Sequence, residues 1–258
     1  MRILITNDDG FDAAGIKSLK KIALGMSNAE NIFVVAPKAN QSAKSRSVSY
    51  KTAFNIIRKN SNEYSVEGTP TDCIIFALDH IMKNKKPDII LSGINWGYNL
   101  SEDIFYSGTV AAAAEGADRG IPSIALSQAY KEHKQELNPY LFAESCGSKL
   151  CLSLYENFSV ALEKTALNVN FPANPLVKYP DCIKIAMVGQ RERSNFGINI
   201  VSKSQNLYTA MIDSISTNRS LTSNDDYVNC LNGYITISPV SMCIQKEKSV
   251  EELRKVKF

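Results

Sequence analysis

Short apolar runs that alternate with helical segments organise the first half of this chain of 258 residues. Each run stops at polar or turn-forming residues, as buried strands do. The runs cover residues 3–5, 32–36, 88–93 and 121–126. Helical patterns cover residues 14–25, 71–82 and 110–119. Buried strands separated by helices predict a three-layer, Rossmann-like α/β fold, in which helices flank a mostly parallel sheet.

The character of the chain changes after about residue 165. β segments are predicted there at 167–172, 183–188 and 233–239, in addition to those at 48–57 and 62–67 in the first half. Residues 190–226 are rich in Ser and Asn and only weakly periodic, which predicts an extended hairpin or arm that packs against a partner chain. We therefore expect residues 1–165 to form a Rossmann-like core, and residues 166–258 to add C-terminal strands and a β-rich arm for oligomer exchange within the same structural domain.

Charge and hydropathy exclude two classes of partner. The net charge is only +3, and the basic residues are scattered. Lys83, Lys85 and Lys86 form the only dense basic cluster of the first half, which is too small for a nucleic-acid-binding face. No stretch approaches the roughly 20 apolar residues of a membrane helix, and the chain starts in a predicted strand rather than in a leader. We expect a cytoplasmic protein with no membrane partner and no stable nucleic-acid partner.

Cysteine and histidine usage narrows the chemistry. The six cysteines form no C-x-x-C pair and lie at no zinc-knuckle spacing, which predicts reduced core thiols. His80 falls on a predicted amphipathic helix and His133 in a polar run, and there is no third histidine. Neither pairs with a nucleophile, which disfavours Ser-His-Asp and Cys-His mechanisms. Any chemistry must therefore use carboxylates, hydroxyls, amides or a metal ion.

Oxygen-rich loops follow three of the predicted strands. The first loop contains Asp8 and Asp9, the second contains Ser42, and the third contains Asn95. Loops that follow neighbouring parallel strands converge at one edge of a sheet. Two adjacent carboxylates repel each other, and a hard divalent cation with oxygen ligands relieves that repulsion. The alternative for the first loop is a simple turn, because Asn, Asp and Gly are common turn formers.

A candidate anion site precedes the alanine-rich helix. Ser107, Gly108 and Thr109 lie where the free N–H groups and the positive dipole end of a helix bind anions such as phosphate. The alternative is simple N-capping by a hydroxyl. A cation site beside an anion site predicts hydrolysis of a phosphate ester, with the metal polarising the phosphoryl oxygen and activating a water molecule.

Seven motifs now connect the chain to a known family. They are Thr6-Asn7-Asp8-Asp9-Gly10, Val34-Val35-Ala36-Pro37 with Asn40-Gln41-Ser42, Gly68-Thr69-Pro70-Thr71-Asp72-Cys73, Ser92-Gly93-Ile94-Asn95-x-Gly97-x-Asn99, Ser107-Gly108-Thr109-Val110, Leu167-Asn168-Val169-Asn170-Phe171-Pro172 and Gly233-Tyr234-Ile235-Thr236-Ile237-Ser238-Pro239. In this order they closely resemble the SurE family, the survival-protein nucleotidases. The resemblance runs from residue 1 to about residue 240.

The resemblance implies a 5′-nucleotidase, a metal-dependent phosphatase that hydrolyses nucleoside 5′-monophosphates and also 3′-monophosphates, with short-chain polyphosphate as a substrate of some members. It implies one divalent ion per subunit, Mg2+ or Mn2+. The implied metal ligands are Asp8, Asp9, Ser42 and Asn95. The implied phosphate-binding residues are Asn99, Ser107, Gly108 and Thr109, and the candidate catalytic residues are Asp8, Asp9 and Ser107. Family members exchange C-terminal segments in homodimers, which sometimes pair into tetramers.

The chain departs from the family pattern at Lys38, Arg46 and Trp96. No implied ligand is lost, and Arg46 and Trp96 are expected to line the entrance and influence substrate preference. Two mechanisms stay open, attack by metal-activated water oriented by Asp8 and attack by Asp8 itself through a phospho-aspartate. A catalytically silent nucleotide-binding module is the alternative function. A Rossmann dehydrogenase is disfavoured, because no G-x-G-x-x-G follows the first strand.

Overall fold

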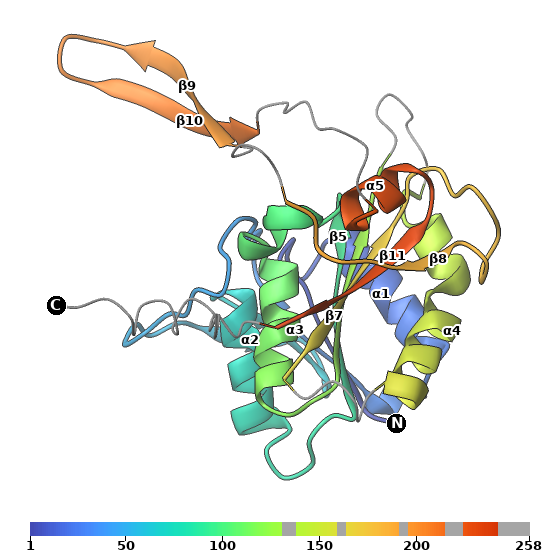
Figure 1. Cartoon of the computed structure of the whole chain (residues 1–258). Coiled ribbons are helices and arrows are strands. Elements are labelled where there is room, and N and C mark those ends of the chain that lie inside the picture. The colour runs from blue at the N-terminus through green and yellow to red at the C-terminus, as the bar shows by residue number, and fades with distance from the viewer. Residues whose placement is uncertain (131–137, 159–163, 191–195, 215–223, 242–258) are drawn as a thin grey trace, which may run out of the picture.

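Among the residues that the structure describes, a nine-stranded, mostly parallel sheet forms the centre (Figure 1). The structure is a computed structural model that describes residues 1–130, 138–158, 164–190, 196–214 and 224–241. The sheet strands are β1 (Ile3–Thr6), β2 (Ile32–Pro37), β3 (Ile56–Arg58), β4 (Glu63–Val66), β5 (Ile89–Trp96), β6 (Ser123–Gln128), β7 (Ala166–Phe171), β8 (Ile183–Ile185) and β11 (Ile235–Val240). Their order is β3-β4-β2-β1-β5-β6-β7-β11-β8, and only the β3–β4 and β7–β11 pairs are antiparallel. The predicted α/β class is confirmed.

Helices cover both faces of this sheet. The helices are α1 (Ala14–Leu24), α2 (Pro70–Phe76), α3 (Gly108–Asp118), α4 (Leu141–Phe158) and α5 (Asp226–Leu231), with the short helices η1 (Ala29–Asn31), η2 (Ala77–Ile81) and η3 (Ser101–Phe105). Figure 1 shows α2 and α3 on one side of the sheet and α1 and α4 on the other. This arrangement gives the three layers that the sequence pattern predicts.

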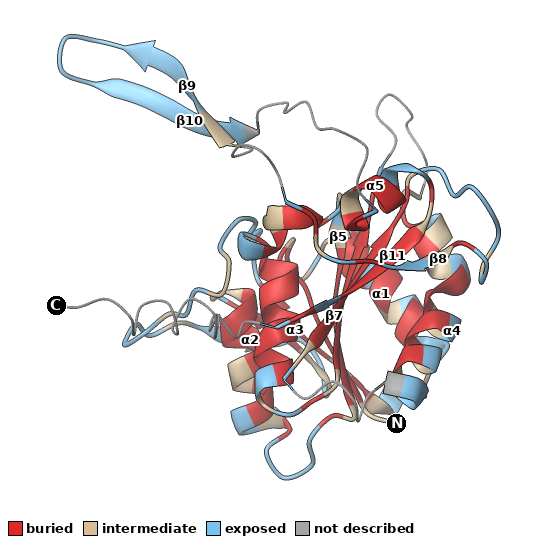
Figure 2. Ribbon diagram, in the orientation of Figure 1, coloured by how far each residue is buried: buried red, intermediate tan, exposed pale blue. Residues whose placement is uncertain are grey.

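The side chains of each strand point alternately to the two faces of the sheet, so the hydrophobic core has one part on each face. Ile3 and Ile5 of β1 pack in a cluster with residues of α1 and α4, whereas Leu4 packs in a second cluster with residues of α2 and α3. Successive side chains of a strand point to opposite faces, so a run that is apolar at every position is buried on both. The buried strands and inner helix faces are coloured red in Figure 2.

The sheet order brings the carboxyl ends of β2, β1, β5 and β6 side by side. Between Ser92 and Asn95 the pairing of β5 with β6 shifts register. Gly93 lies in this irregular stretch with φ +131°, and a Cβ there would sit 2.2 Å from the carbonyl oxygen of Leu126. Only glycine fits such a position, and β-bulges of this kind redirect the side chains that follow them. The loop predicted to contain Asn95 is therefore the irregular end of β5.

Two local predictions differ from the structure. Residues 48–55 form no strand, because the Ser49 backbone N–H donates to the Asp72 carboxylate at the start of α2 (3.0 Å) instead of joining the sheet. Thr69, not Thr71, caps α2. Its hydroxyl oxygen accepts from the Asp72 N–H, and the Asp72 carboxylate accepts from the Thr69 N–H. The sequence patterns also do not predict α4, where Gly147 packs against Ile22 and small residues interrupt the apolar spacing.

The predicted arm is a hairpin of two antiparallel strands, β9 (Phe196–Lys203) and β10 (Tyr208–Ser214). It extends away from the sheet in Figure 1 and is mostly exposed in Figure 2. The remaining parts of the predicted arm at 191–195 and 215–223, and also His133, lie outside the described residues. Within the described part of the chain, no helix has the length and apolar character needed to cross a membrane.

Candidate active site

The acidic loop after β1 is a closed turn. The Asn7 side chain donates to the Gly10 carbonyl oxygen (2.9 Å) and accepts from the Gly10 N–H (3.3 Å). Gly10 has φ +112°, a conformation that favours glycine. The backbone of this loop is therefore the turn that its residue types predict. The turn does not involve the carboxylates of Asp8 and Asp9, which make other contacts.

Three segments meet at Asp8 and Asp9. Asp8 accepts a hydrogen bond from the Thr109 hydroxyl at the start of α3 (2.5 Å), and its carbonyl oxygen accepts from the Gln41 N–H in the loop after β2 (2.7 Å). Asp9 accepts from the Trp96 N–H at the end of β5 (3.3 Å). The loops after β1 and β2, the end of β5 and the start of α3 therefore come together, as the order of the strands predicts.

Both carboxyl groups have raised pKa values. Burial raises the pKa of Asp8 above its ordinary value of 3.8, although the Thr109 hydroxyl and the backbone of Thr109 and Gly108 oppose that shift. Burial and the neighbouring charge of Asp8 raise the pKa of Asp9 to about 6. Among the described residues no Lys, Arg or His forms an ion pair with either acid. The ionised pair therefore lacks a compensating positive charge from this part of the chain.

Asn95, near the end of β5, lies beside Asp9, which follows β1. Its side-chain N–H group donates to the Gly97 carbonyl oxygen (3.0 Å), which fixes the orientation of the amide. The amide oxygen is then the atom of this side chain that can ligate a cation. Because Trp96, the next residue, binds Asp9 through its N–H, the irregular end of β5 positions Asn95 and Asp9 together.

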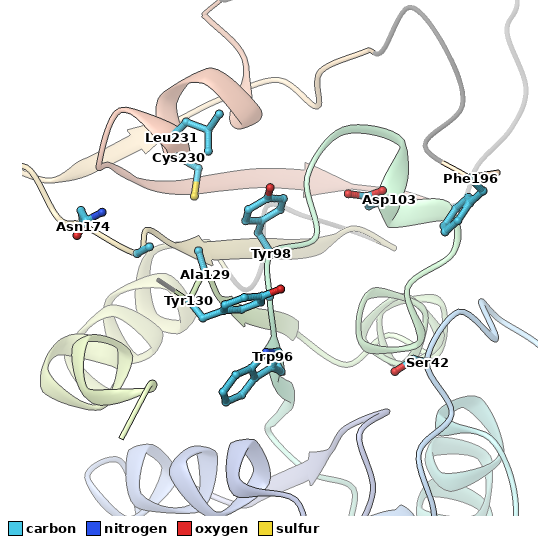
Figure 3. A pocket seen from close by; sticks show the side chains of 12 residues that line it. Ser42, Trp96, Tyr98, Asp103, Ala129, Tyr130, Asn174, Phe196, Cys230 and Leu231 are labelled. Atoms are coloured by element: carbon cyan, nitrogen blue, oxygen red, sulfur yellow. The ribbon is translucent and has the colours of Figure 1, made fainter. Parts of the chain in front are cut away.

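Ser42 lies on the loop after β2, one residue beyond the Gln41 contact to Asp8. Its side chain is exposed and lines the cavity drawn in Figure 3. Its neighbours Ala43 and Ser45 have φ values of 58° and 52°, and the Ser45 hydroxyl donates to the Phe105 carbonyl oxygen (2.6 Å). This unusual backbone is therefore held by contacts to the segment that leads into α3.

Arg46 is not among the residues that line the cavity of Figure 3, although the sequence led us to expect it at the entrance. Its guanidinium group binds the Glu115 carboxylate (2.6 and 3.0 Å) and the Asp118 carboxylate (2.6 Å), both on α3. Two acids of α3 attract the guanidinium away from the opening. Arg46 therefore ties the Ser42 loop to the helix whose start faces Asp8.

The start of α3 combines an N-cap with a close approach to Asp8. The Ser107 hydroxyl accepts from the Val110 N–H (3.1 Å), which confirms the capping alternative and leaves the hydroxyl hydrogen able to donate elsewhere. A Cβ on Gly108 would sit 2.8 Å from the Asp8 Cβ, so glycine allows this approach. The Thr109 hydroxyl already donates to Asp8, and this side chain orients the acid.

Asn99 is held by polar residues that the sequence patterns do not single out as functional. Its backbone N–H donates to Asn170 (2.7 Å), its carbonyl oxygen accepts from Asn168 (2.8 Å) and Asn170 (3.1 Å), and its side-chain amide donates to Ser127 (2.8 Å). The Leu167–Pro172 motif contained the signal, since Asn168 and Asn170 alternate with apolar residues of β7. The two asparagines thus orient the loop that carries Asn99.

The donor set suits a hard cation. Asp8, Asp9, Asn95 and Ser42 offer only oxygen, which Mg2+ and Mn2+ prefer over nitrogen or sulfur. In the described ranges no group of three or more His, Cys, Asp and Glu side chains is placed to hold a metal. The five described cysteines that are free are also buried. The uncompensated acid pair is therefore the feature that a divalent ion fits.

Comparisons with known proteins agree with this geometry. The family model described as "Survival protein SurE" matches residues 3–195. A protein of Wolbachia pipientis subsp. Culex pipiens named 5′-nucleotidase SurE is 40% identical over 246 residues, which cover 94% of this chain and 88% of that protein. A protein of the same name from Methylocella silvestris is 40% identical over 204 residues, covering 79% and 78%. The crystal structure of a SurE protein from Aquifex aeolicus is 30% identical, with a TM-score of 0.80 over 99% of this chain and 100% of that chain.

Proposed function

The chain belongs to the SurE family, and from this premise we propose that it is a 5′-nucleotidase that hydrolyses nucleoside 5′-monophosphates to nucleoside and phosphate. The observation that carries the proposal is the pair of uncompensated carboxylates, of which Asp8 is buried against the start of α3 and Asp9 lies at the end of β5. The names of the relatives support the same reaction. Nucleoside 3′-monophosphates and short-chain polyphosphate are further substrates that we propose for the same site.

We propose that Asp8, Asp9, Asn95 and Ser42 hold one divalent ion, Mg2+ or Mn2+. Such an ion would polarise a phosphoryl oxygen and lower the pKa of a water molecule. Its support is the all-oxygen donor set and the absence of an ion pair to either acid within the described chain. A positive charge there would also favour the ionised forms of both acids, which burial disfavours.

The residues at the start of α3 would bind the phosphoryl group. The Ser107 hydroxyl has its hydrogen free to donate to a phosphoryl oxygen while its oxygen caps the helix. The positive dipole end of α3 and the backbone at Gly108 favour a negative charge in front of the helix. Asn99 supplies a side chain that donates to Ser127 of β6, while its backbone N–H donates to Asn170 of β7. We assign Thr109 to the same phosphate-binding segment, with its hydroxyl orienting Asp8.

Asp8 is the proposed centre of the reaction. Its fixed orientation, set by the Thr109 hydroxyl, suits either of two roles. In the first role Asp8 orients or deprotonates the water that attacks phosphorus. In the second role Asp8 itself attacks and forms a phospho-aspartate. Borohydride reduction of protein quenched during turnover separates them, because only an acyl phosphate at Asp8, which forms in the second role, is reduced to homoserine at that position.

A panel of phosphate-release assays tests the function. Wild-type protein with Mg2+, Mn2+ or other divalent ions should release phosphate from nucleoside monophosphates, and chelation should stop the release. Asp8→Asn or Asp9→Asn should abolish this activity without changing the circular dichroism spectrum. Asp12→Asn, the same change at an exposed position of the same loop, is the matched control and should keep full activity. Full turnover in both site variants would refute the site, whereas tight nucleotide binding without phosphate release would favour the silent binding module.

We further propose that residues 1–165 and 166–258 act as one structural unit in a cytoplasmic homodimer or tetramer. The support is that β7 and β11 extend the central sheet, while the β9–β10 hairpin carries exposed apolar side chains away from it. Exposed apolar surface of this kind is typical of an interface. A second copy of the chain is the proposed partner of the hairpin.

A further inference from the structure

An aromatic-walled cavity of about 780 Å3 adjoins the candidate metal site (Figure 3). Ser42 lines it together with aromatic side chains from several parts of the chain. The aromatic lining residues are Trp96, Tyr98, Tyr130 and Phe196. Cavities of this size hold small-molecule ligands, and aromatic walls bind their planar, apolar parts. None of these four residues has a role in the phosphate chemistry proposed above.

Trp96 and Tyr130 form a pair at the carboxyl end of the sheet. Their ring centroids are 5.3 Å apart with the planes tilted by 31°, and Figure 3 shows them next to each other. Trp96 ends β5 and Tyr130 follows β6, and the Gly97 N–H donates to the Gln128 carbonyl oxygen (3.0 Å), which fixes the two strand ends. The rings of Tyr140 and Trp96 form a T-shaped pair with centroids 6.1 Å apart. The indole is therefore held in place by its neighbours.

The two rings nevertheless keep large exposed surfaces. Trp96 is 52% exposed and Tyr130 is 47% exposed, whereas the apolar side chains in the middle of β5 and β6 are almost fully buried. An exposed, oriented indole at the mouth of a cavity is a surface on which a planar ring can stack. The backbone N–H of Trp96 donates to Asp9, so this surface lies directly beside the candidate metal ligands.

We propose that Trp96, supported by Tyr130, is the platform on which the base of a nucleoside monophosphate stacks, and that it determines preference for base-containing phosphate esters. This inference rests on the proposed nucleotidase function, because it places the base in the cavity and the phosphate at the start of α3. Base–aromatic stacking is worth about 1–3 kcal/mol per base. The larger purine rings cover more of the indole than pyrimidines and should bind more tightly.

Fluorescence tests the platform without relying on catalysis, because Trp96 is the only tryptophan of the chain. Adenosine or guanosine should quench its emission in a saturable way, and ribose should not. Adenosine binding that is detected by calorimetry but leaves Trp96 emission unchanged would overturn the proposal. Tyr130→Leu should weaken the quenching by adenosine, because it removes the ring that supports the indole.

Kinetics with and without a base give the second test. The measured quantity is the ratio of kcat/KM for AMP to kcat/KM for ribose 5-phosphate. Trp96→Ala should lower this ratio about fivefold or more, since 1.4 kcal/mol corresponds to a factor of ten. Trp96→Phe, which keeps a planar ring, should retain most of it. Tyr50→Ala removes another exposed aromatic ring outside the cavity lining and should leave the ratio unchanged.

The outcomes separate the platform from the function. An unchanged ratio in Trp96→Ala, with AMP and ribose 5-phosphate both hydrolysed, overturns the platform and keeps the phosphatase. Phosphate release from neither substrate by the wild-type protein overturns the nucleotidase proposal, and the adenosine titration alone then decides whether Trp96 binds a base.

Discussion

Asp8 and Asp9 are neighbours in the chain, but their carboxyl groups have different surroundings. Asp8 is almost fully buried and is oriented by the start of α3. Asp9 is partly exposed and lies near Tyr140. Burial is the main cause that raises the pKa of the Tyr140 hydroxyl, and the charge of Asp9 raises it further. This difference suits Asp8 to an orienting or nucleophilic role, and it suits Asp9 to binding a cation at the opening of the site.

The raised pKa of Asp9 predicts a pH-dependent cost of folding in the metal-free protein. The unfolded chain loses this proton near pH 3.8 and the folded chain near pH 6, so the folded state binds more protons between these values. Stability therefore falls as the pH rises from about 4 to about 6 and stays lower above it. One pKa unit equals about 1.4 kcal/mol, so the full shift would correspond to about 3 kcal/mol, and solvent screening at this partly exposed group reduces it. Asp9→Asn should therefore raise the free energy of unfolding by roughly 1–2 kcal/mol at pH 8 and by little at pH 3.

Chemical denaturation of chelator-treated protein at both pH values measures this effect. Asp12→Asn is the control and should show no such difference. Added Mg2+ should stabilise the wild type at pH 8 more than the Asp9→Asn variant, because the variant offers one carboxylate fewer. An Asp9→Asn variant that is equally stable relative to wild type at both pH values contradicts the electrostatic account.

The irregular end of β5 determines where Asn95 and Trp96 point. Gly93→Ala would place a Cβ 2.2 Å from the Leu126 carbonyl oxygen at φ +131°. Backbone strain and overpacking together should cost about 3 kcal/mol or more of unfolding free energy and weaken metal binding. Gly120→Ala is the control, since it has φ +76° but open space around it, and should cost roughly 1–2 kcal/mol. Thermal unfolding and metal titration measure both effects, and equal costs for the two variants would contradict a steric role for Gly93.

The loop after β2 is held to α3 by Arg46. Arg46→Ala should release the loop that carries Ser42 and weaken Mg2+ or Mn2+ binding about tenfold, a typical effect of losing a residue that orients a ligand. Lys44→Ala, an exposed position of the same loop, should bind the metal as the wild type does. Isothermal calorimetry with the metal alone gives the answer, and unchanged affinity in Arg46→Ala would mean that the ion pairs only stabilise the fold.

The β9–β10 hairpin is separate from the central sheet and is mostly exposed. Ile198 pairs with Ile212 across β9 and β10, and Ile200 lies two residues along the same face, with exposures of 67%, 70% and 52%. A two-stranded ribbon with exposed apolar side chains needs a partner surface. Ile198→Lys with Ile212→Lys should therefore convert the dimer that we propose to monomer in sedimentation velocity. Leu141→Lys, at an exposed apolar position of α4, should keep the wild-type mass, and a dimer that survives the double change would exclude this face from the interface.

The sequence alone determined the class of fold and the proposed metal ligands. Uninterrupted apolar runs are buried on both faces wherever they lie, and the order of parallel strands brings the residues that follow them to one edge. Asp8, Asp9 and Asn95 could be brought together on that basis. The hairpin was also predictable, because a polar, weakly periodic segment has no core of its own.

Only the tertiary structure decided how these residues are held, because the contacts join segments far apart in the chain. Thr109 donates to Asp8 across 101 positions, and Asn170 orients Asn99 across 71. Arg46 pairs with α3 because two acids of that helix face it. Trp96 meets Tyr130 because β5 and β6 are adjacent. Local patterns record which residues are polar or apolar, whereas the partner of each polar group depends on which strands and helices become neighbours.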